Sequence, residues 1–577
     1  AVQFVGRPGQ HPEPSLKNLP AILFFSPATT NLFVTLFTTP IPYIFRNLWI
    51  FVALYPKSYY DDTNCWKQII NKEFIMKPTK SLSFFNLILI IVMTVYSFSS
   101  MSSSFFMMGL KSFPWFLISA FFYFIPYALI VSEYTRSYSN RTGGIYDWLK
   151  DAFSPRIAFI TAFLWYCSYF TWIISLFMKL LIPFTIMLFG QDLTSAEQWF
   201  GIDTAYWIMV LSLVAVFCMT WVINRGHQAV FSFLKTSSYA MVGLLLISGI
   251  GNLMLMVNTP QLIAQNMQQS LAAPSFFKGT NDSFLSQLPF FIFAITAFGG
   301  LDTIASLVDK SGQQQKKFPK ALIISAVIIV VLYFGGIMLW SGANNLNVLR
   351  ETDQFHLGNL MYGLMGSLAN NLSIAFGLSA SAQAFLYQAF IRYTAFTLFV
   401  AYIGLLSSIT YTPLKSLIQG TPKEIWPQFL TKINQKEMPQ TALWIQAAVV
   451  SVCIIGLSLN STILGALFNQ LTYMTNVARA IPYFVVAASY PFYRIKNPVL
   501  LKHSLIASHW QGYLCSLSVC TATLIAITFQ VYQPFHTGEY VQALLLIIGP
   551  ILFGLLGSSI YQRFEKKRTQ LFLEDNL

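Results

Sequence analysis

The chain has 577 residues, of which 55% are hydrophobic, 16% aromatic and only 10% charged, with a formal net charge of +14. About a quarter of the residues in an ordinary soluble domain are charged, so the composition excludes that class and is typical of a polytopic helical membrane protein. Basic residues gather in the cytoplasmic loops of such proteins, so the positive charge gives no reason to expect nucleic acid as a partner.

Residues 1–75 differ from the rest of the chain. All 18 methionines lie at or beyond Met76, and the apolar stretch 32–55 is interrupted by two prolines and Arg46. This stretch predicts neither a signal peptide nor a clean spanning helix. We expect 1–75 to be a disordered extension or one without a part in function, and 76–577 to form the membrane domain. An interfacial extension is the alternative for 1–75.

Apolar runs of about 18 or more residues predict transmembrane helices. Beyond Met76 the sequence predicts about twelve of them, at 84–109, 114–134, 157–189, 205–223, 236–256, 287–308, 321–341, 383–411, 441–459, 464–490, 507–531 and 540–561. No stretch between them is long enough for a soluble domain. The expected fold class is therefore an all-α integral membrane protein.

Basic residues in the loops predict the orientation. If the N-terminus is inside, the inner loops and the C-terminal tail hold most of the Lys and Arg residues, and the outer loops hold only Lys111, Lys278 and Arg350. Positively charged loops stay on the cytoplasmic side. We expect a multi-pass protein of the plasma (inner) membrane with both termini in the cytoplasm.

The first and sixth predicted helices each carry an interruption. Six of the eight residues from Ser97 to Ser104 are serine, and the sixth helix contains Gly299 and Gly300, close to Asp302. When helices 1–5 and 6–10 are taken as two halves, the interruptions fall in corresponding positions. Paired interruptions of this kind are typical of inverted-repeat transporters with a binding site near the bilayer midplane.

A helix broken inside a bilayer leaves backbone N–H and C=O groups without partners. Each costs a few kcal/mol, so a break must line a polar cavity or bind something. The N-terminus of the second half-helix suits a carboxylate, and the carbonyls that end the first half suit a cation. Two facing breaks therefore predict a site for a zwitterion such as an amino acid. The alternatives are helix packing by small residues for the serines and close packing for the glycines.

Ionisable residues deep in a membrane are usually functional, and Asp302 is the first candidate, as a gate or as the partner of a substrate ammonium group. Lys179, Arg392 and Arg479 are further gating or charge candidates. Lys179 and Arg479 could equally snorkel to a helix end, and all three could pair with protein carboxylates. We expect Glu133 to form an ion pair with Arg136 or Arg141 at the inner surface. Asp309 is expected to pair with a neighbouring lysine: Lys310, Lys316 or Lys317.

Several stretches resemble the amino acid–polyamine–organocation permeases. They are "GGIYDWLKDAF" (143–153), "FGGLDTIASLVDKSGQQQKKFPKALI" (298–323) and "IQGTPKEIWPQFLTKINQKEMPQTALWIQ" (418–446). Two more, "FIPYALIVSEY" and "AFITAFLWYCSYFTWIISLFMKLLIPF", narrow the resemblance to the glutamate/GABA-antiporter-like branch and its YjeM-type inner-membrane group. The similarity covers 84–561 and does not extend to 1–75.

The resemblance implies a five-plus-five inverted repeat with broken helices 1 and 6 and an amino acid or related amine as substrate, exchanged by antiport. It implies that 97–100 meets the substrate carboxylate and 298–302 its amine side. The chain departs from the family's usual pattern, since serine replaces glycine in helix 1 and Asp302 replaces glutamate. The expected substrate-binding residues are Tyr96, Ser97, Phe98, Ser99, Ser100, Trp165, Tyr169, Phe298, Gly299, Gly300, Leu301 and Asp302.

Other functions find less support in the sequence. A membrane-embedded transferase would need clustered acidic or histidine residues, but the six histidines are scattered over loops and helix ends. The loop after helix 2 lacks the signature of a major-facilitator transporter, and no phosphate-binding GxxxxGK[ST] stretch indicates use of ATP. A nutrient sensor on the same fold stays open. We expect no cofactor and no metal, a small-molecule substrate and the lipid bilayer as partners, and a monomer or homodimer.

Overall fold

The computed structural model describes residues 83–273, 287–307, 316–350, 359–459, 464–497, 506, 508–536 and 538–574. Contacts between residues divide the chain into two units, Ala1–Pro78 and Thr79–Leu577, and all described residues belong to the second. The expected boundary between 75 and 76 lies outside the described residues, as do Asp309 and Lys310.

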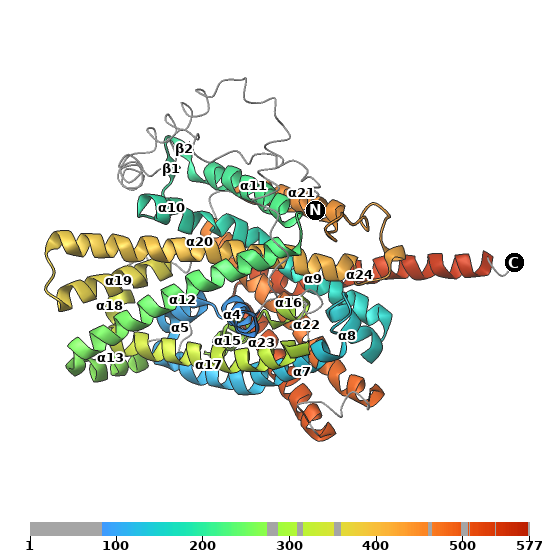
Figure 1. Cartoon of the computed structure of the whole chain (residues 1–577), viewed down its shortest axis with the longest axis horizontal. Coiled ribbons are helices and arrows are strands. Elements are labelled where there is room, and N and C mark those ends of the chain that lie inside the picture. Colours follow the sequence, from blue (N-terminus) through green and yellow to red (C-terminus); the bar gives the residue numbers. More distant parts are fainter. Residues whose placement is uncertain are drawn as a thin grey trace, which may run out of the picture. The chain divides into compact units, whose positions relative to one another are not determined.

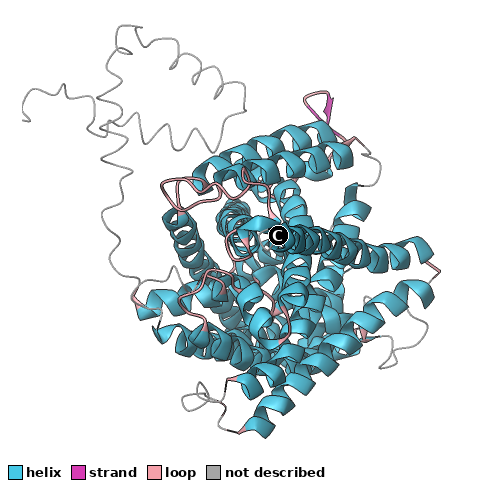
Figure 2. Ribbon diagram, turned by 90° about the vertical axis from the view of Figure 1, so that its right-hand side faces the viewer, coloured by secondary structure: helices cyan, strands magenta, loops and turns pink. Residues whose placement is uncertain are grey.

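The described residues are almost entirely helical (Figure 2). The first half contains α4 (Phe84–Val95), α5 (Phe98–Met108), η3 (Gly109–Lys111), α6 (Ser112–Ser119), η4 (Ala120–Phe124), α7 (Ile125–Ser137), α8 (Ile145–Ala152), α9 (Pro155–Lys179), α10 (Leu181–Phe189), η5 (Leu193–Ser195), α11 (Thr204–Ile223), α12 (His227–Asn258) and α13 (Pro260–Ala272). The second half contains α15 (Pro289–Ala297), α16 (Leu301–Ala305), α17 (Phe318–Ala343), α18 (Leu346–Arg350), α19 (Leu360–Ala375), α20 (Ala380–Ile418), η8 (Lys423–Ile425), α21 (Gln440–Ser458), α22 (Leu464–Lys496), α23 (His509–His536) and α24 (Tyr540–Glu574). Two strands, β1 (Gln198–Trp199) and β2 (Ile202–Asp203), form a short antiparallel hairpin before α11.

This architecture confirms the predicted fold class, because each of the twelve predicted segments is mainly helical in the part that the structure describes. Among the described residues, nine helical segments are long and apolar enough to cross a membrane. The first of them, Phe84–Ser137, contains two predicted helices, and Phe290–Ala305 is a shorter apolar helix. The tenth predicted segment, 464–490, lies in α22, whose interior contains Pro482 and Pro491.

Local sequence explains several helix boundaries. The Ser83 hydroxyl accepts a hydrogen bond from the N–H of Asn86 at the start of α4, and the Ser154 hydroxyl does the same for Ile157 at the start of α9. Serine is favoured at this position because its oxygen satisfies an N–H that has no partner within the helix. Gly190 ends α10 with a φ of 73°, a conformation that suits glycine.

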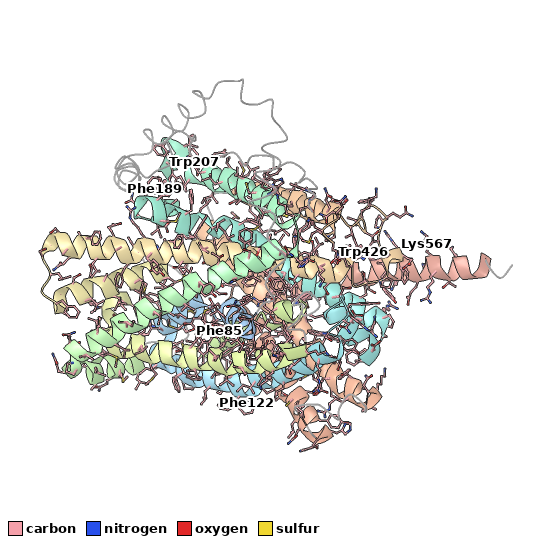
Figure 3. The ribbon with its side chains drawn as sticks, in the orientation of Figure 1. Phe85, Phe122, Phe189, Trp207, Trp426 and Lys567 are labelled. Atoms are coloured by element: carbon pink, nitrogen blue, oxygen red, sulfur yellow. The ribbon has the colours of Figure 1, made fainter. Side chains whose placement is uncertain are left out.

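Large apolar side chains cover much of the outer surface of the helices. Phe85 is 68% exposed and Phe122 57% exposed, and Figure 3 labels both. Exposed apolar residues of this size continue along α11, α12, α23 and α24. Contiguous apolar surface is rare on a soluble monomer, whereas lipid covers it in a membrane protein.

The interrupted segments lie among other helices. α4 packs against α12 and α17, while α16 packs against α4, α7 and α20. Figure 1 shows α4, α15 and α16 close to one another in the view, with α12 and α17 running across them. The fold therefore surrounds both breaks with helices from either half of the sequence.

Candidate functional site

The first break is a two-residue extended segment between α4 and α5. Tyr96 has φ −66° and ψ 127°, and Ser97 has φ −117° and ψ 112°. The Ser97 hydroxyl accepts a hydrogen bond from the N–H of Ser100 at 3.1 Å, so this serine caps the second half-helix. The break is thus narrower than the serine run that predicted it.

The remaining serines belong to α5. The Ser104 hydroxyl donates to the carbonyl of Ser100 at 2.6 Å, one helical turn earlier. Ser102, Ser103 and Ser104 are buried. A serine that bonds back to the preceding turn is compatible with a helix, so Ser104 fits the alternative interpretation of close helix packing. Among the described residues, the buried hydroxyl of Ser102 has no hydrogen-bond partner.

The second break separates α15 from α16 at 298–300. Gly300 has φ 116°, a left-handed value that side chains rarely adopt, and it precedes the first residue of α16. The next two side chains, Leu301 and Asp302, are both buried. Phe298 points its ring into the core, where it stacks on Phe124 with ring centroids 4.5 Å apart. Gly300 therefore permits the break, which lies where the glycine pair predicted it.

One hydroxyl joins the two breaks. Tyr333 of α17 accepts a hydrogen bond from the N–H of Ser97 at 3.1 Å and donates one to the carbonyl of Ala297 at 2.8 Å. Its ring also lies 4.9 Å from that of Tyr96. A Cβ placed on Gly300 would lie 3.9 Å from the carbonyl oxygen of Thr94 at the end of α4. The two unwound segments therefore lie side by side.

Asp302 is fully buried beside the second break. Its Oδ2 accepts hydrogen bonds from the indole N–H of Trp165 and, at 3.1 Å, from the hydroxyl of Tyr169, both on α9. Among the described residues its other oxygen, Oδ1, has no hydrogen-bond partner. The structure thus brings together Asp302, Trp165 and Tyr169, and leaves one carboxylate oxygen available for a ligand.

Arg479 of α22 lies on the other side of the same aromatic group. Its guanidinium carbon is 4.4 Å from the centroid of the Trp172 ring and 5.3 Å from that of Tyr169. Its Nη2 donates to the hydroxyl of Tyr483 at 3.2 Å and lies against Gly299. Of the three predicted cations, Lys179, Arg392 and Arg479, these contacts place Arg479 at the second break.

Further unpaired polar atoms lie close to this group. Among the described residues, the buried hydroxyls of Tyr96, Tyr123 and Tyr127 have no hydrogen-bond partner. Tyr123 and Tyr127 stack on each other with centroids 5.5 Å apart, and the Tyr127 ring lies 5.3 Å from that of Tyr483. Buried polar groups without partners are rare in native structures, so their gathering here suits a site that receives a polar solute.

The other two predicted cations have different surroundings. The guanidinium of Arg392 donates to the carbonyls of Met187 and Leu188 at 3.4 and 3.1 Å, at the C-terminus of α10. Cations are favourable at helix C-termini, so this contact is structural in kind. Lys179 is the last residue of α9, and its side chain is half-buried.

The stretch 143–153 packs at the ends of α16 and α20. The Ser416 hydroxyl donates to the carbonyl of Gly143, and a Cβ on Gly144 would lie 2.6 Å from the hydroxyl oxygen of Ser306. The ammonium of Lys415, which is fully buried, donates to the carbonyl of Ser306 at 3.3 Å. These contacts tie the loop after α7 to the end of the second broken helix.

The ion pair expected for Glu133 stays a prediction, and the structure shows other contacts of Glu133 and of Arg141. Its carboxylate accepts a hydrogen bond at 2.7 Å from the hydroxyl of Tyr490. Arg141 lies 3.4 Å from a carboxylate oxygen of Asp151 and 3.9 Å from one of Asp147. Glu133 therefore lies against α22, and Arg141 lies beside two carboxylates of α8, those of Asp147 and Asp151.

Sequence reasoning missed Tyr333 and Tyr483. Tyr483 follows Arg479 by four residues, the spacing that places two side chains on the same helix face, and this pattern could have identified it. Tyr333 lies in the apolar run 322–340, where its hydroxyl and that of Ser325 are the only two hydroxyl groups. The pairing of its hydroxyl with two distant backbone segments depends on tertiary structure.

The unit consists of apolar helices. Its first and sixth spans are interrupted, the two interruptions lie side by side, and a buried carboxylate lies next to them. These features define a membrane carrier of the broken-helix class. The chain belongs to the amino acid permease family, whose family model matches residues 82–553. This membership makes it a secondary transporter of an amino acid or related amine, and not an enzyme.

Three relatives illustrate the similarity. The "Inner membrane transporter YjeM" of Salmonella typhimurium is 32% identical over 492 residues, which cover 85% of this chain and 97% of the relative. The "Aspartate/glutamate permease AcaP" of Lactococcus lactis subsp. cremoris is 23% identical, over 86% of this chain and 98% of its own length. The "Probable agmatine/putrescine antiporter AguD" of Lactococcus lactis subsp. lactis is 25% identical over 39% of this chain and 44% of the relative.

Proposed function

We propose that the chain exchanges an amino acid or related amine across the inner membrane by alternating access, with the solute held between the breaks at 96–97 and 298–300. The observation that carries this proposal is the Tyr333 hydroxyl, which hydrogen-bonds both unwound segments at once. A solute at this point contacts both broken helices, so a change in their relative position would move its access from one side to the other.

In this proposal Asp302 receives the substrate ammonium group. The Trp165 and Tyr169 donors hold Oδ2, so the carboxylate keeps one orientation, and Oδ1 has no partner among the described residues. An ammonium group would supply the missing hydrogen bond and an opposite charge. Hydrogen bonds between charged groups are shorter and about twice as strong as neutral ones.

The first turn of α5 is proposed to receive the substrate carboxylate. The N–H of Ser97 already donates to the hydroxyl of Tyr333, and the N–H of Ser100 donates to the hydroxyl of Ser97. The N–H groups of Phe98 and Ser99 belong to the first helical turn and have no intrahelical acceptor. The helix dipole adds a positive potential at this end, which favours an anion.

The direction and driving force of transport are also proposals. The sequence contains no phosphate-binding GxxxxGK[ST] stretch, so a second solute or an ion gradient must supply the energy. The antiporter name of one relative supports exchange, and the inner-membrane name of another supports that location. The concentration of basic residues in alternate loops supports cytoplasmic placement of both termini.

Counterflow in proteoliposomes tests this proposal. Vesicles that contain the purified chain and are loaded with a mixture of unlabelled amino acids should accumulate a labelled one from outside. Asp302→Asn should reduce this uptake by at least about tenfold, because a hydrogen bond to a charged group contributes about 1.5–3 kcal/mol. Membrane insertion should be unchanged. Wild-type protein that binds an amino acid without any counterflow would indicate a sensor, and normal counterflow by Asp302→Asn would remove this residue from the site.

A further inference from the structure

The guanidinium of Arg479 is a buried charge at the proposed site. The broken helices alone do not explain the role of this guanidinium. The residue is 4% exposed, and its Nε is buried without a hydrogen-bond partner among the described residues. Its known hydrogen bond goes to a neutral hydroxyl, that of Tyr483, at 3.2 Å. A guanidinium has five N–H donors, so its contacts with the described residues leave most of its hydrogen-bonding capacity unused.

Among the described residues, no carboxylate lies within 4.0 Å of this guanidinium. The ion pairs of Asp147 with Arg141 and Lys150, and of Asp151 with Arg141, lie at α8. The charges of Asp302 and Arg479 interact, but Tyr169 lies between them, since its hydroxyl bonds Asp302 and its ring faces Arg479. A residue that served only to neutralise Asp302 would be expected in direct contact with it, because a buried ion pair is favourable only with close geometry.

The backbone at the break brings Arg479 to the substrate position. A Cβ on Gly299 would fall onto Nη2 of Arg479 and 2.9 Å from the hydroxyl oxygen of Tyr483. The absence of a side chain at Gly299 therefore lets the guanidinium approach the unwound segment. The aromatic faces of Trp172 and Tyr169 stabilise the cation in this position and leave its edges able to donate.

We propose that Arg479 binds the side-chain carboxylate of the substrate, and that the substrate is an acidic α-amino acid. This inference depends on the proposed function, in which Asp302 binds the substrate ammonium group and the first turn of α5 binds the α-carboxylate. Arg479 then binds the remaining charged group, the side-chain carboxylate. The planar fork of a guanidinium matches a carboxylate with two parallel hydrogen bonds. A diamine would instead bring a second ammonium group towards Arg479, where like charges repel.

The test compares isosteric competitors in counterflow of labelled L-glutamate by the full chain. L-Glutamate and L-aspartate should compete at least about tenfold better than L-glutamine and L-asparagine, and putrescine and agmatine should compete poorly. A site built to bind a charged or polar group rejects analogues that leave this group unpaired. Arg479→Gln should abolish the preference for acids over amides, and Arg479→Lys should keep part of it.

Two further variants make the comparison sharp. Arg225→Gln is the matched control, because this guanidinium also stacks on an aromatic ring, 3.6 Å from the Trp221 centroid, but lies exposed beyond the end of α11. It should keep the wild-type preference. Tyr483→Phe removes the hydrogen bond to Arg479 and keeps the ring, so it should weaken the preference several-fold, and it carries the test if Arg479→Gln fails to fold.

The outcomes separate this inference from the proposed function. Counterflow of glutamine or of a diamine at least as good as that of glutamate would overturn the inference while leaving the transporter in place. An unchanged acid preference in folded Arg479→Gln, or in Tyr483→Phe where the first variant does not fold, would also overturn it. Wild-type protein that moves no amino acid or amine would contradict the proposed function itself.

Discussion

The hydroxyl of Tyr333 connects two backbone segments that are 200 residues apart in the sequence. It supplies the acceptor for the N–H of Ser97 and the donor for the carbonyl of Ala297. Both groups lie where a helix is interrupted, so neither has its usual helical partner. A single side chain therefore satisfies one backbone group of each break and sets the distance between them.

Tyr333→Phe tests this connection. The variant keeps the aromatic ring, which packs against Tyr96 and Phe298 at centroid distances of 4.9 and 5.1 Å. It leaves the buried carbonyl of Ala297 and the partly buried N–H of Ser97 unpaired, and a buried group without a partner costs about 1–3 kcal/mol. We expect a lower melting temperature and at least about a tenfold loss of counterflow rate. A variant with wild-type rate and stability would show that the hydroxyl does not join the breaks.

At the scale of elements, the sequence predicted the helices and the two interruptions well. Apolar runs predicted the transmembrane helices, and the Gly299–Gly300 pair predicted the position of the second break within two residues. The serine run located the first break but not its extent, because serine both caps a helix, as Ser97 does, and fits inside one, as Ser104 does. Local sequence does not decide between these two states.

The partners of the site residues were harder to predict than the residues themselves. Asp302 stood out as a charge in an apolar run, but its donors Trp165 and Tyr169 lie more than 130 residues away. Arg392 and Arg479 looked alike in sequence, yet one contacts the end of α10 and the other the break at Gly299. Their roles depend on helix packing, which a single sequence leaves undetermined.

Gly299→Ala tests whether the close approach at the second break matters for transport. The new methyl group would meet the Arg479 guanidinium and lie 2.9 Å from the Tyr483 hydroxyl oxygen, so it displaces the groups proposed to bind substrate. We expect strongly reduced counterflow from a protein that still reaches the membrane. Gly335→Ala on α17 is the control, because nothing lies within 4 Å of its added Cβ, and it should transport normally. Equal activities of the two variants would show that the contact at Gly299 is dispensable.

At the scale of the whole molecule, the family match begins at residue 82, and the described helices begin at Phe84. We propose that 76–577 is sufficient for transport. A chain that lacks 1–75 should insert into the membrane and show counterflow within about twofold of the full chain. A loss of transport by a properly inserted truncated protein would assign a function to these residues.

The site depends on the entire helical unit. Its residues come from α5, α9, α16, α17 and α22, which span both halves of the sequence. No single segment of the chain forms the site, so binding a solute would couple helices from both halves. This coupling is what alternating access requires, because the substrate must contact each element that moves.

An experimental structure of the chain with bound substrate would test this mechanism most directly. We expect density for the solute between the Tyr96–Ser97 and Phe298–Gly300 segments, with its ammonium group at Oδ1 of Asp302 and its carboxylate at the first turn of α5. Density at another place, with protein side chains or lipid filling the space between the two breaks, would contradict the proposal that these segments hold the transported solute.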